Sequence, residues 1–220
     1  MEYTINIKGR LMDLSTPQVM GILNVTPDSF YSGSRKQTEM EIAQRANQII
    51  EEGGSIIDVG AFSTRPGADE VSEEEEGRRL KFALDIVRRE QPDAAVSVDT
   101  YRPTLARKCI EEWGADIIND VSEGGITGIV NVPLEQRQEE YPEMFRVVGE
   151  LKVPYILMSV QPTLETMMKG FAKEVQQLRD LGAKDIILDP GFCFGKNLIQ
   201  NYQTVSYTHL RAHETGRNLV

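Results

Sequence analysis

Cysteine is nearly absent from this sequence: Cys109 and Cys193 are the only two in 220 residues. Their spacing matches no pattern of metal ligands, which excludes a cysteine-based zinc site. The N-terminus also lacks the basic segment and apolar run of a signal peptide. We therefore expect a protein of the reducing cytoplasm.

Positive charge and long apolar runs are also scarce. Lys and Arg number 24 against 34 Asp and Glu, giving a net charge of -10. With no basic patch, this balance argues against a nucleic-acid surface. No apolar run approaches the ~20 residues of a membrane helix. We expect small-molecule partners, with no nucleic acid and no membrane.

A recurring pattern organises what is present. Three times a helix ends at glycine and an apolar strand leads to a carboxylate or amide: Gly53 to Asp58, Gly114 to Asn119, and Gly182 to Asp189. Apolar spacing predicts further helices over 39–52, 72–90, 103–113 and 164–181, and strands over 19–23, 94–98 and 155–158. Six strand–helix units in a row predict an α/β fold with a parallel sheet and helices outside.

The ends of the chain depart from this pattern. Residues 2–8 and 9–15 predict a short N-terminal β-hairpin at the bottom of the sheet. A complete (β/α)8 barrel of the TIM type takes ~250 residues, so we expect an incomplete barrel domain over residues 1–204. Residues 205–220 show no regular apolar spacing, and we interpret them as a non-native tail. His209 and His213 lie there without the third ligand that a zinc site needs.

Two other segments carry expectations. Residues 122–141 are long and glycine-containing for a connection, which predicts a surface insertion. Glu73 to Glu76 predict a solvated first helical turn opened by Ser72, since acidic groups favour helix N-termini.

Asn24 follows an apolar run, Val19 to Leu23, that is typical of a strand buried on both faces. An amide oxygen just beyond such a strand suits Mg²⁺. Thr26, Asp28 and Ser29 add oxygens in a loop that Pro27 stiffens. On its own, this stretch favours a polar turn that ends the strand, and only the loops further along the chain reverse that preference.

Two more polar loops follow predicted strands: Ser63-Thr64-Arg65-Pro66-Gly67, and Asp189 to Lys196 with the sequence Asp-Pro-Gly-Phe-Cys-Phe-Gly-Lys. Each loop alone is a common turn. In this order, together with Asn24 to Phe30, they closely resemble the dihydropteroate synthase family, which joins p-aminobenzoate to a pterin in folate synthesis. The resemblance runs from about Thr16 to Thr204.

The resemblance implies roles for particular residues. Asn24 would bind the Mg²⁺ that neutralises the diphosphate of the pterin substrate, and Thr64 and Arg65 would contact the substrates as catalytic residues. Pterin binding would fall to Thr64, Asp99, Asn119 and Asp189, and the p-aminobenzoate loop and wall to Ser63, Arg65, Pro66 and Phe194. Carboxylates and an amide fit the guanine-like edge of a pterin.

Simpler roles stay open for several of these residues. Arg65 could be a loop cation paired with a glutamate, and Phe194 could be ordinary packing. Asp99 or Thr100 could cap the following helix, and Asn119 could cap a turn. Lys196 lacks the spaced glycines of a P-loop.

The chain also departs from the family. Tyr31-Ser32-Gly33 stands where an acid is common, Ser159-Val160 replaces His-Met, and Cys193 replaces a usual glycine. The last two strands, which in the family supply a lysine and an Arg-x-His pair, have no counterpart. We therefore expect this chain to bind pterin weakly and turn over little.

The resemblance further implies a homodimeric, sulfonamide-targeted transferase for an intact member. Two alternatives remain: a pterin-binding methyltransferase domain, and a non-catalytic pterin-binding fragment.

Overall fold

The computed structural model describes residues 3–25, 35–62, 71–125 and 141–214, with the side chains of residues 35–36 and 207–214 excepted. The chain divides into two compact units, residues 1–119 and 120–220. Among the described helices, none has the length and apolar character needed to cross a bilayer.

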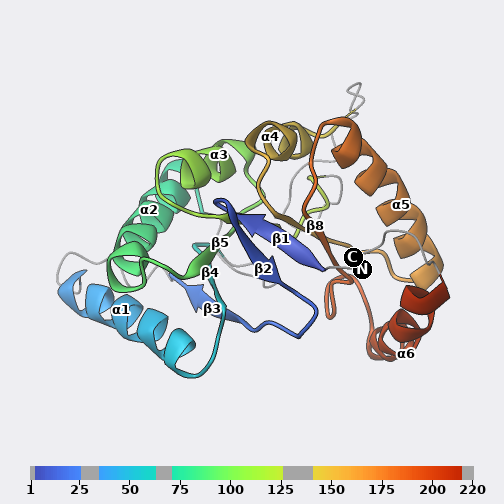
Figure 1. Ribbon diagram of the computed structural model, residues 1–220, viewed down its shortest axis with the longest axis horizontal. Coiled ribbons are helices and arrows are strands. Elements are labelled where there is room, and N and C mark those ends of the chain that lie inside the picture. The colour runs from blue at the N-terminus through green and yellow to red at the C-terminus, as the bar shows by residue number, and fades with distance from the viewer. Residues whose placement is uncertain (1–2, 26–34, 63–70, 126–140, 215–220) are drawn as a thin grey trace. The chain divides into compact units, whose positions relative to one another are not determined.

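Parallel strands form the centre of the first unit. They are β3 (Met20–Asn24), β4 (Ile56–Gly60), β5 (Ala95–Asp99) and the start of β6 (Ile117–Asp120), paired in that order. The helices that follow the first three strands are α1 (Arg35–Glu51), α2 (Glu73–Glu90) and α3 (Pro103–Glu111). Figure 1 shows these helices along the outer side of the strands. The predicted strand–helix alternation is confirmed here.

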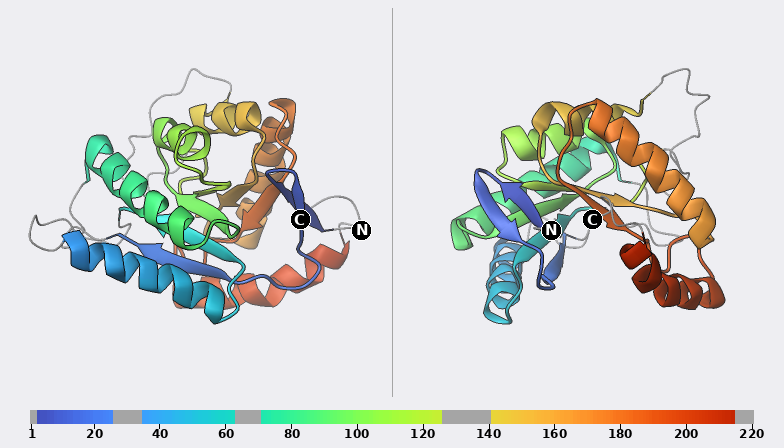
Figure 2. Two further views of the ribbon diagram at one scale, coloured as in Figure 1. Left: turned by 60° about the vertical axis from the view of Figure 1, so that its left-hand side comes forward. Right: turned by 45° about the vertical axis from the view of Figure 1, so that its right-hand side comes forward.

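An antiparallel hairpin, β1 (Thr4–Ile7) and β2 (Arg10–Asp13), precedes the sheet as predicted. The Lys8 amine lies 2.7 Å from the Asp116 carboxylate, and Arg10 donates to the Asp93 carbonyl at 3.1 Å. Asp93 precedes β5 and Asp116 precedes β6. The hairpin, dark blue in Figure 2, therefore lies at the amino ends of the strands, opposite their carboxyl ends.

Strand β3 is more exposed than the sequence indicates. We expected it to be buried on both faces, but Ile22 is 57% exposed and Val19, just before the strand, is 61% exposed. Among the described strands β3 pairs only with β4, so its other edge meets no strand. Asn24 is the last residue of β3 rather than the first residue beyond it.

The first turn of α2 is not fully solvated. The Ser72 hydroxyl caps the helix as predicted, accepting a hydrogen bond from the Glu75 amide. Glu76, however, is fully buried: it accepts from the Thr100 hydroxyl at 2.6 Å and lies 3.3 Å from the Arg102 guanidinium. Burial raises the pKa of Glu76, and Thr100 and Arg102 oppose that shift. The expectation fails because residues beyond β5 cover this helix face.

The second unit contains α4 (Glu143–Leu151), β7 (Tyr155–Met158), α5 (Leu164–Asp180), β8 (Ile186–Asp189) and α6 (Leu198–Glu214). Strands β7 and β8 are parallel, with Met158 opposite Asp189. Within the described ranges the chain thus has the six predicted strand–helix units. Helix α6 extends past Thr204 into the segment interpreted as a tail; that this segment is non-native stays a prediction. The side chains of His209 and His213 lie outside the described residues.

The turn after β6 corrects another expectation. Residues 122–125, the start of the expected surface insertion, are all buried. The Asp120 carboxylate accepts from the Ser122 and Gly124 amides at 2.8 and 2.9 Å, and from the Tyr155 hydroxyl at 2.6 Å. Because these bonds draw the chain inward, the segment begins as part of the core. Residues 126–140 lie outside the described residues.

Candidate active site at the carboxyl ends of the strands

Polar side chains occupy one row across the first unit. Asn24, Gly60, Asp99 and Asn119 are register partners on four neighbouring strands, each at or next to its carboxyl end. Carboxyl ends of parallel strands are where α/β folds place their sites. The register therefore brings together three residues that the sequence predicts for one site.

Gly60, in the middle of this row, has no side chain and so leaves a gap between Asn24 and Asp99. A Cβ atom at this position would lie 2.9 Å from Asn24 Oδ1 and 3.5 Å from Asp99 Oδ2. Both oxygens thus border the gap that the missing side chain leaves. Sequence analysis did not single out Gly60, although a glycine ending an apolar strand signals close approach of neighbouring groups.

The side chain of Asn119 is hydrogen-bonded to a buried aspartate, Asp58. Its Nδ2 donates to Asp58 Oδ2 at 3.2 Å, and only 8% of Asn119 and 5% of Asp58 are exposed. Burial raises the pKa of Asp58, while the Ser97 and Asn119 side chains oppose the shift. The sequence pattern grouped Asp58 with Asn119 and Asp189 as strand-end residues. Asp58 differs from the other two, because β4 continues for two residues beyond it and Asp58 pairs with Ser97, deeper in the sheet.

Helix and turn capping does not account for this row. The N-cap of α3 is Arg102, and no side chain caps that helix. Thr100 instead accepts from the Arg102 amide and donates to Glu76. The turn after β6 is closed by Asp120 rather than by Asn119.

In the second unit, Asp189 ends β8 and opens the predicted glycine-containing loop. Its Oδ1 accepts from the Gly191 amide at 2.8 Å. Gly191 has φ +62°, and a Cβ there would lie 2.2 Å from the Ser159 carbonyl oxygen, so a larger residue does not fit. Phe194 is half-buried in the same loop.

Lys196 stabilises the loop backbone. Its amine donates to the carbonyls of Ser159, Gly191 and Phe194 at 3.0, 3.1 and 3.2 Å. Burial lowers the pKa of Lys196, while the charges of Glu123 and Asp189 raise it. The geometry fits the expectation that Lys196 is no P-loop lysine. Sequence analysis did not predict that Lys196 bonds to the loop backbone. Only the folded loop brings the three carbonyls together at one point.

The other predicted residues, Ser63, Thr64, Arg65 and Pro66, lie outside the described residues, as do Thr26, Asp28 and Ser29. The structure therefore brings together Asn24, Asp99 and Asn119 in the first unit. It places Asp189 and Phe194 in one loop of the second.

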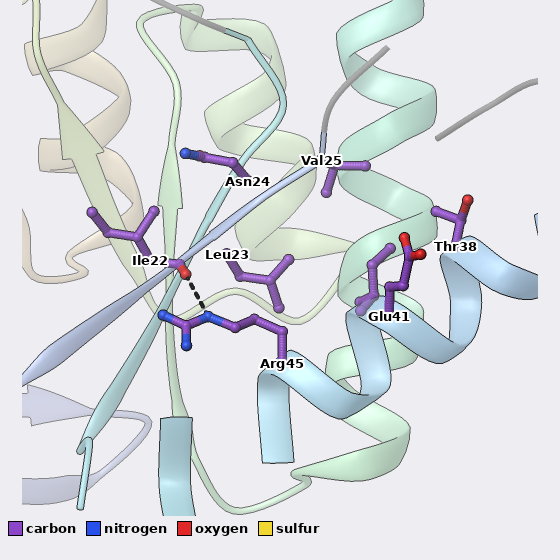
Figure 3. A pocket seen from close by; sticks show the side chains of 8 residues that line it. Ile22, Leu23, Asn24, Val25, Thr38, Glu41 and Arg45 are labelled. Atoms are coloured by element: carbon purple, nitrogen blue, oxygen red, sulfur yellow. Dashed lines mark hydrogen bonds between the residues drawn. The ribbon is translucent and has the colours of Figure 1, made fainter. Parts of the chain in front are cut away.

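A pocket of about 350 Å³ lies between β3 and α1 (Figure 3). It is lined by Ile22, Leu23, Asn24, Val25, Thr38, Glu41, Ile42 and Arg45. Arg45 donates to the Ile22 carbonyl at 3.2 Å. Figure 3 shows Leu23 directed towards α1 and Asn24 directed to the other side of β3. The pocket thus shares Asn24 with the row, whereas Asp99 and Asn119 are not among its lining residues.

Comparisons with known proteins identify the family. The family described as "Pterin binding enzyme" matches residues 20–216. Dihydropteroate synthase of Escherichia coli K12 is 36% identical over 214 residues, covering 90% of this chain and 70% of that protein. The chain belongs to the dihydropteroate synthase family.

Solved structures of family members agree with this assignment. Xanthomonas albilineans dihydropteroate synthase with 4-aminobenzoic acid matches 98% of this chain and 76% of that one, with a TM-score of 0.79 and 30% identity. The same enzyme in complex with 7,8-dihydropteroate has a TM-score of 0.75 at 28% identity, covering 97% of this chain and 74% of that one. The expected TIM-type α/β fold is confirmed, and so is the family's function, dihydropteroate synthesis for folate.

Proposed function

We propose that this chain binds a pterin diphosphate and p-aminobenzoate and joins them as dihydropteroate at the row of Asn24, Asp99 and Asn119. The observation that carries this proposal is their shared register, with Gly60 opening a space between Asn24 and Asp99. The family members solved with 4-aminobenzoic acid and with 7,8-dihydropteroate support the choice of substrates.

Pterin recognition follows from the hydrogen-bonding capacity of this row. A pterin presents ring N–H and amino donors beside a carbonyl acceptor. The Asp99 carboxylate accepts from such donors, and the Asn119 amide both accepts and donates. That Asp189 and Thr64 also bind the pterin stays a prediction of the family resemblance.

Asn24 is the proposed Mg²⁺ ligand. Among the described residues no cluster of three His, Cys, Asp or Glu side chains could hold a metal. Mg²⁺ nonetheless suits a site with one or two protein oxygens, because substrate phosphates and waters supply the others. Asn24 Oδ1, with Asp99 Oδ2 across the Gly60 gap, fits that mode. The bound ion would neutralise charge on the departing diphosphate.

The reaction itself needs positioning more than a strong acid or base. The p-aminobenzoate nitrogen bonds to the pterin methylene carbon, the bond from that carbon to the diphosphate oxygen breaks, and the amine proton passes to solvent. Asp99 and Asn119 would hold the pterin ring so that its methylene faces the amine. The loop of Ser63, Thr64, Arg65 and Pro66 would contact p-aminobenzoate, and the Arg65 cation suits developing negative charge. That Phe194 forms a wall for p-aminobenzoate stays a prediction of the family resemblance.

A sensitive coupling assay tests this function. Purified chain is supplied with pterin diphosphate and radiolabelled p-aminobenzoate, with and without Mg²⁺. We expect slow product formation that requires Mg²⁺ and falls about 100-fold or more in Asp99→Ala. Glu165→Gln, on the exposed surface of α5, is the matched control and should leave the rate unchanged. Equal rates in wild type and Asp99→Ala would contradict the proposal. Homodimer formation and sulfonamide binding stay predictions.

A further inference from the structure

Asp58 is an unusual residue for its place in the sheet. It sits inside β4 between Ile57 and Val59 and is 5% exposed, and burial of a carboxylate without a paired charge is unfavourable. The hydrogen bond to Oδ2 comes from Asn119, which lies 61 positions away in sequence. A residue chosen only for packing at this position would be apolar.

The contact with Asn119 has a direction. An ionised carboxylate accepts hydrogen bonds and donates none, so it binds the Nδ2 end of an amide and repels the oxygen end. An asparagine side chain can rotate by half a turn at little steric cost, exchanging its donor for its acceptor. Facing Asp58, only one of those two orientations is favourable.

We propose that Asp58 is a positioning residue that fixes the orientation of the Asn119 amide. One Nδ2 hydrogen is committed to Asp58, while Oδ1 accepts from a pterin donor and the second Nδ2 hydrogen stays available to the pterin. This inference rests on the proposed function, because it assumes that Asn119 meets the pterin. In the strand register Asp58 lies opposite Ser97, two positions closer to the amino ends than Gly60, Asp99 and Asn119, so its effect on a ligand would pass through Asn119.

A double-mutant cycle tests the inference. Dissociation constants for pterin-6-carboxylic acid are measured by fluorescence with the full chain, for wild type, Asp58→Asn, Asn119→Ala and the double variant. An asparagine at 58 can donate or accept, so the orientation of Asn119 is lost. We expect Asp58→Asn to weaken binding about tenfold. In the Asn119→Ala background the same change should have no further effect, since the two residues act as one unit.

A matched control separates positioning from general damage. Asp116 is also a buried aspartate of the first unit, but it contacts the Val96 amide and Arg88 at the amino ends of the strands. Asp116→Asn should lower the melting temperature and leave pterin affinity within about twofold. An equal loss of affinity from Asp58→Asn in both backgrounds, or none in either, would overturn the positioning role.

Two further readouts keep the outcomes distinct. If Asn119→Ala and Asp99→Ala both bind the pterin like wild type, the proposed function is wrong. If they weaken binding and Asp58→Asn does not, only the positioning role is wrong. If Asp58→Asn does not fold, NMR of the wild type provides the test through hydrogen exchange of the Asn119 side-chain amide. Its signals are assigned by their loss in Asn119→Ala. One hydrogen protected from exchange supports the inference, and rapid exchange of both overturns it.

Discussion

The two units use polar residues at strand ends in different ways. In the first unit, Asn119 bonds across the sheet to Asp58 from a distant strand. In the second, Asp120 and Asp189 bond to backbone amides two to four positions further along their own turns. A carboxylate that accepts hydrogen bonds from the amides of its own turn has fewer lone pairs left for a ligand. Asn119 donates to Asp58, so its oxygen lone pairs are not used by that bond. Position at a strand end is therefore not sufficient to assign a binding role.

The largest expected effect is on the Asp120 turn. Asp120→Asn replaces one carboxylate oxygen by an amide donor, which then faces either the Ser122 donors or the Gly124 amide and the Tyr155 hydroxyl. The free energy of unfolding should fall by about 3 kcal/mol. Urea unfolding of both variants measures this, with Asp180→Asn at the exposed end of α5 as control. A loss below about 0.5 kcal/mol would show that the turn does not depend on its carboxylate.

Glu174 makes the second unit sensitive to pH. Burial, reinforced by the nearby Glu123 charge, raises the pKa of Glu174 to about 8. The unfolded state releases the Glu174 proton above its ordinary pKa of 4.5, whereas the folded state keeps it until about pH 8. The stabilisation from this proton is therefore fully present below about pH 4.5 and is lost as the pH rises through about 8. Between about pH 5 and about pH 9 the loss should be on the order of 3 kcal/mol.

Glu174→Gln should remove most of this pH dependence, and the melting temperature measured across the same range checks it. Glu165→Gln, a change at an exposed glutamate of the same helix, should retain it. An identical pH profile in wild type and Glu174→Gln would contradict the assignment.

Lys196 tests how far the Asp189 loop depends on its own contacts. Lys196→Met removes the donor shared by three carbonyls and should destabilise the chain by about 2 kcal/mol. Lys169→Met, on the exposed face of α5, should cost less than about 0.5 kcal/mol. Denaturant unfolding of both variants measures the two free energies of unfolding. Equal losses would show that Lys196 does not stabilise the loop.

The smallest effect concerns Cys193, which stands where the family usually has glycine. Its φ of +69° is a left-handed conformation that side chains disfavour. Cys193→Gly should therefore stabilise the chain by about 0.5–1 kcal/mol, while Cys193→Ala should not. Thermal unfolding of the two variants distinguishes relief of backbone strain from loss of the thiol.

Much of the fold could be predicted from local signals. Gly53, Gly114 and Gly182 all have positive φ, which is why a glycine after an apolar helix marks its end so well. Apolar spacing then places α1, α2, α3 and α5 within a few residues. The start of α1 was missed by four residues, since residues 35–38 carry little apolar signal.

The details of the site depend on register, which local sequence does not encode. The apolar run of β4 stops at Asp58, but backbone pairing continues to Gly60. Because of these two additional residues, Gly60 rather than Asp58 pairs with Asp99. Glu76 was misjudged for the same reason, because its partners come from beyond β5. Asn24, Asp99 and Asn119 could be named from the sequence, whereas the residues that shape the space around them could not.

Binding of a pterin to the isotope-labelled wild-type chain tests the central claim most directly. In a ¹⁵N NMR titration with pterin-6-carboxylic acid, the account predicts that the amide signals of Asn24, Gly60, Asp99 and Asn119 shift together and saturably. Shifts confined to Leu23, Ile42 and Arg45 between β3 and α1, or to the amino ends of the strands, would contradict it.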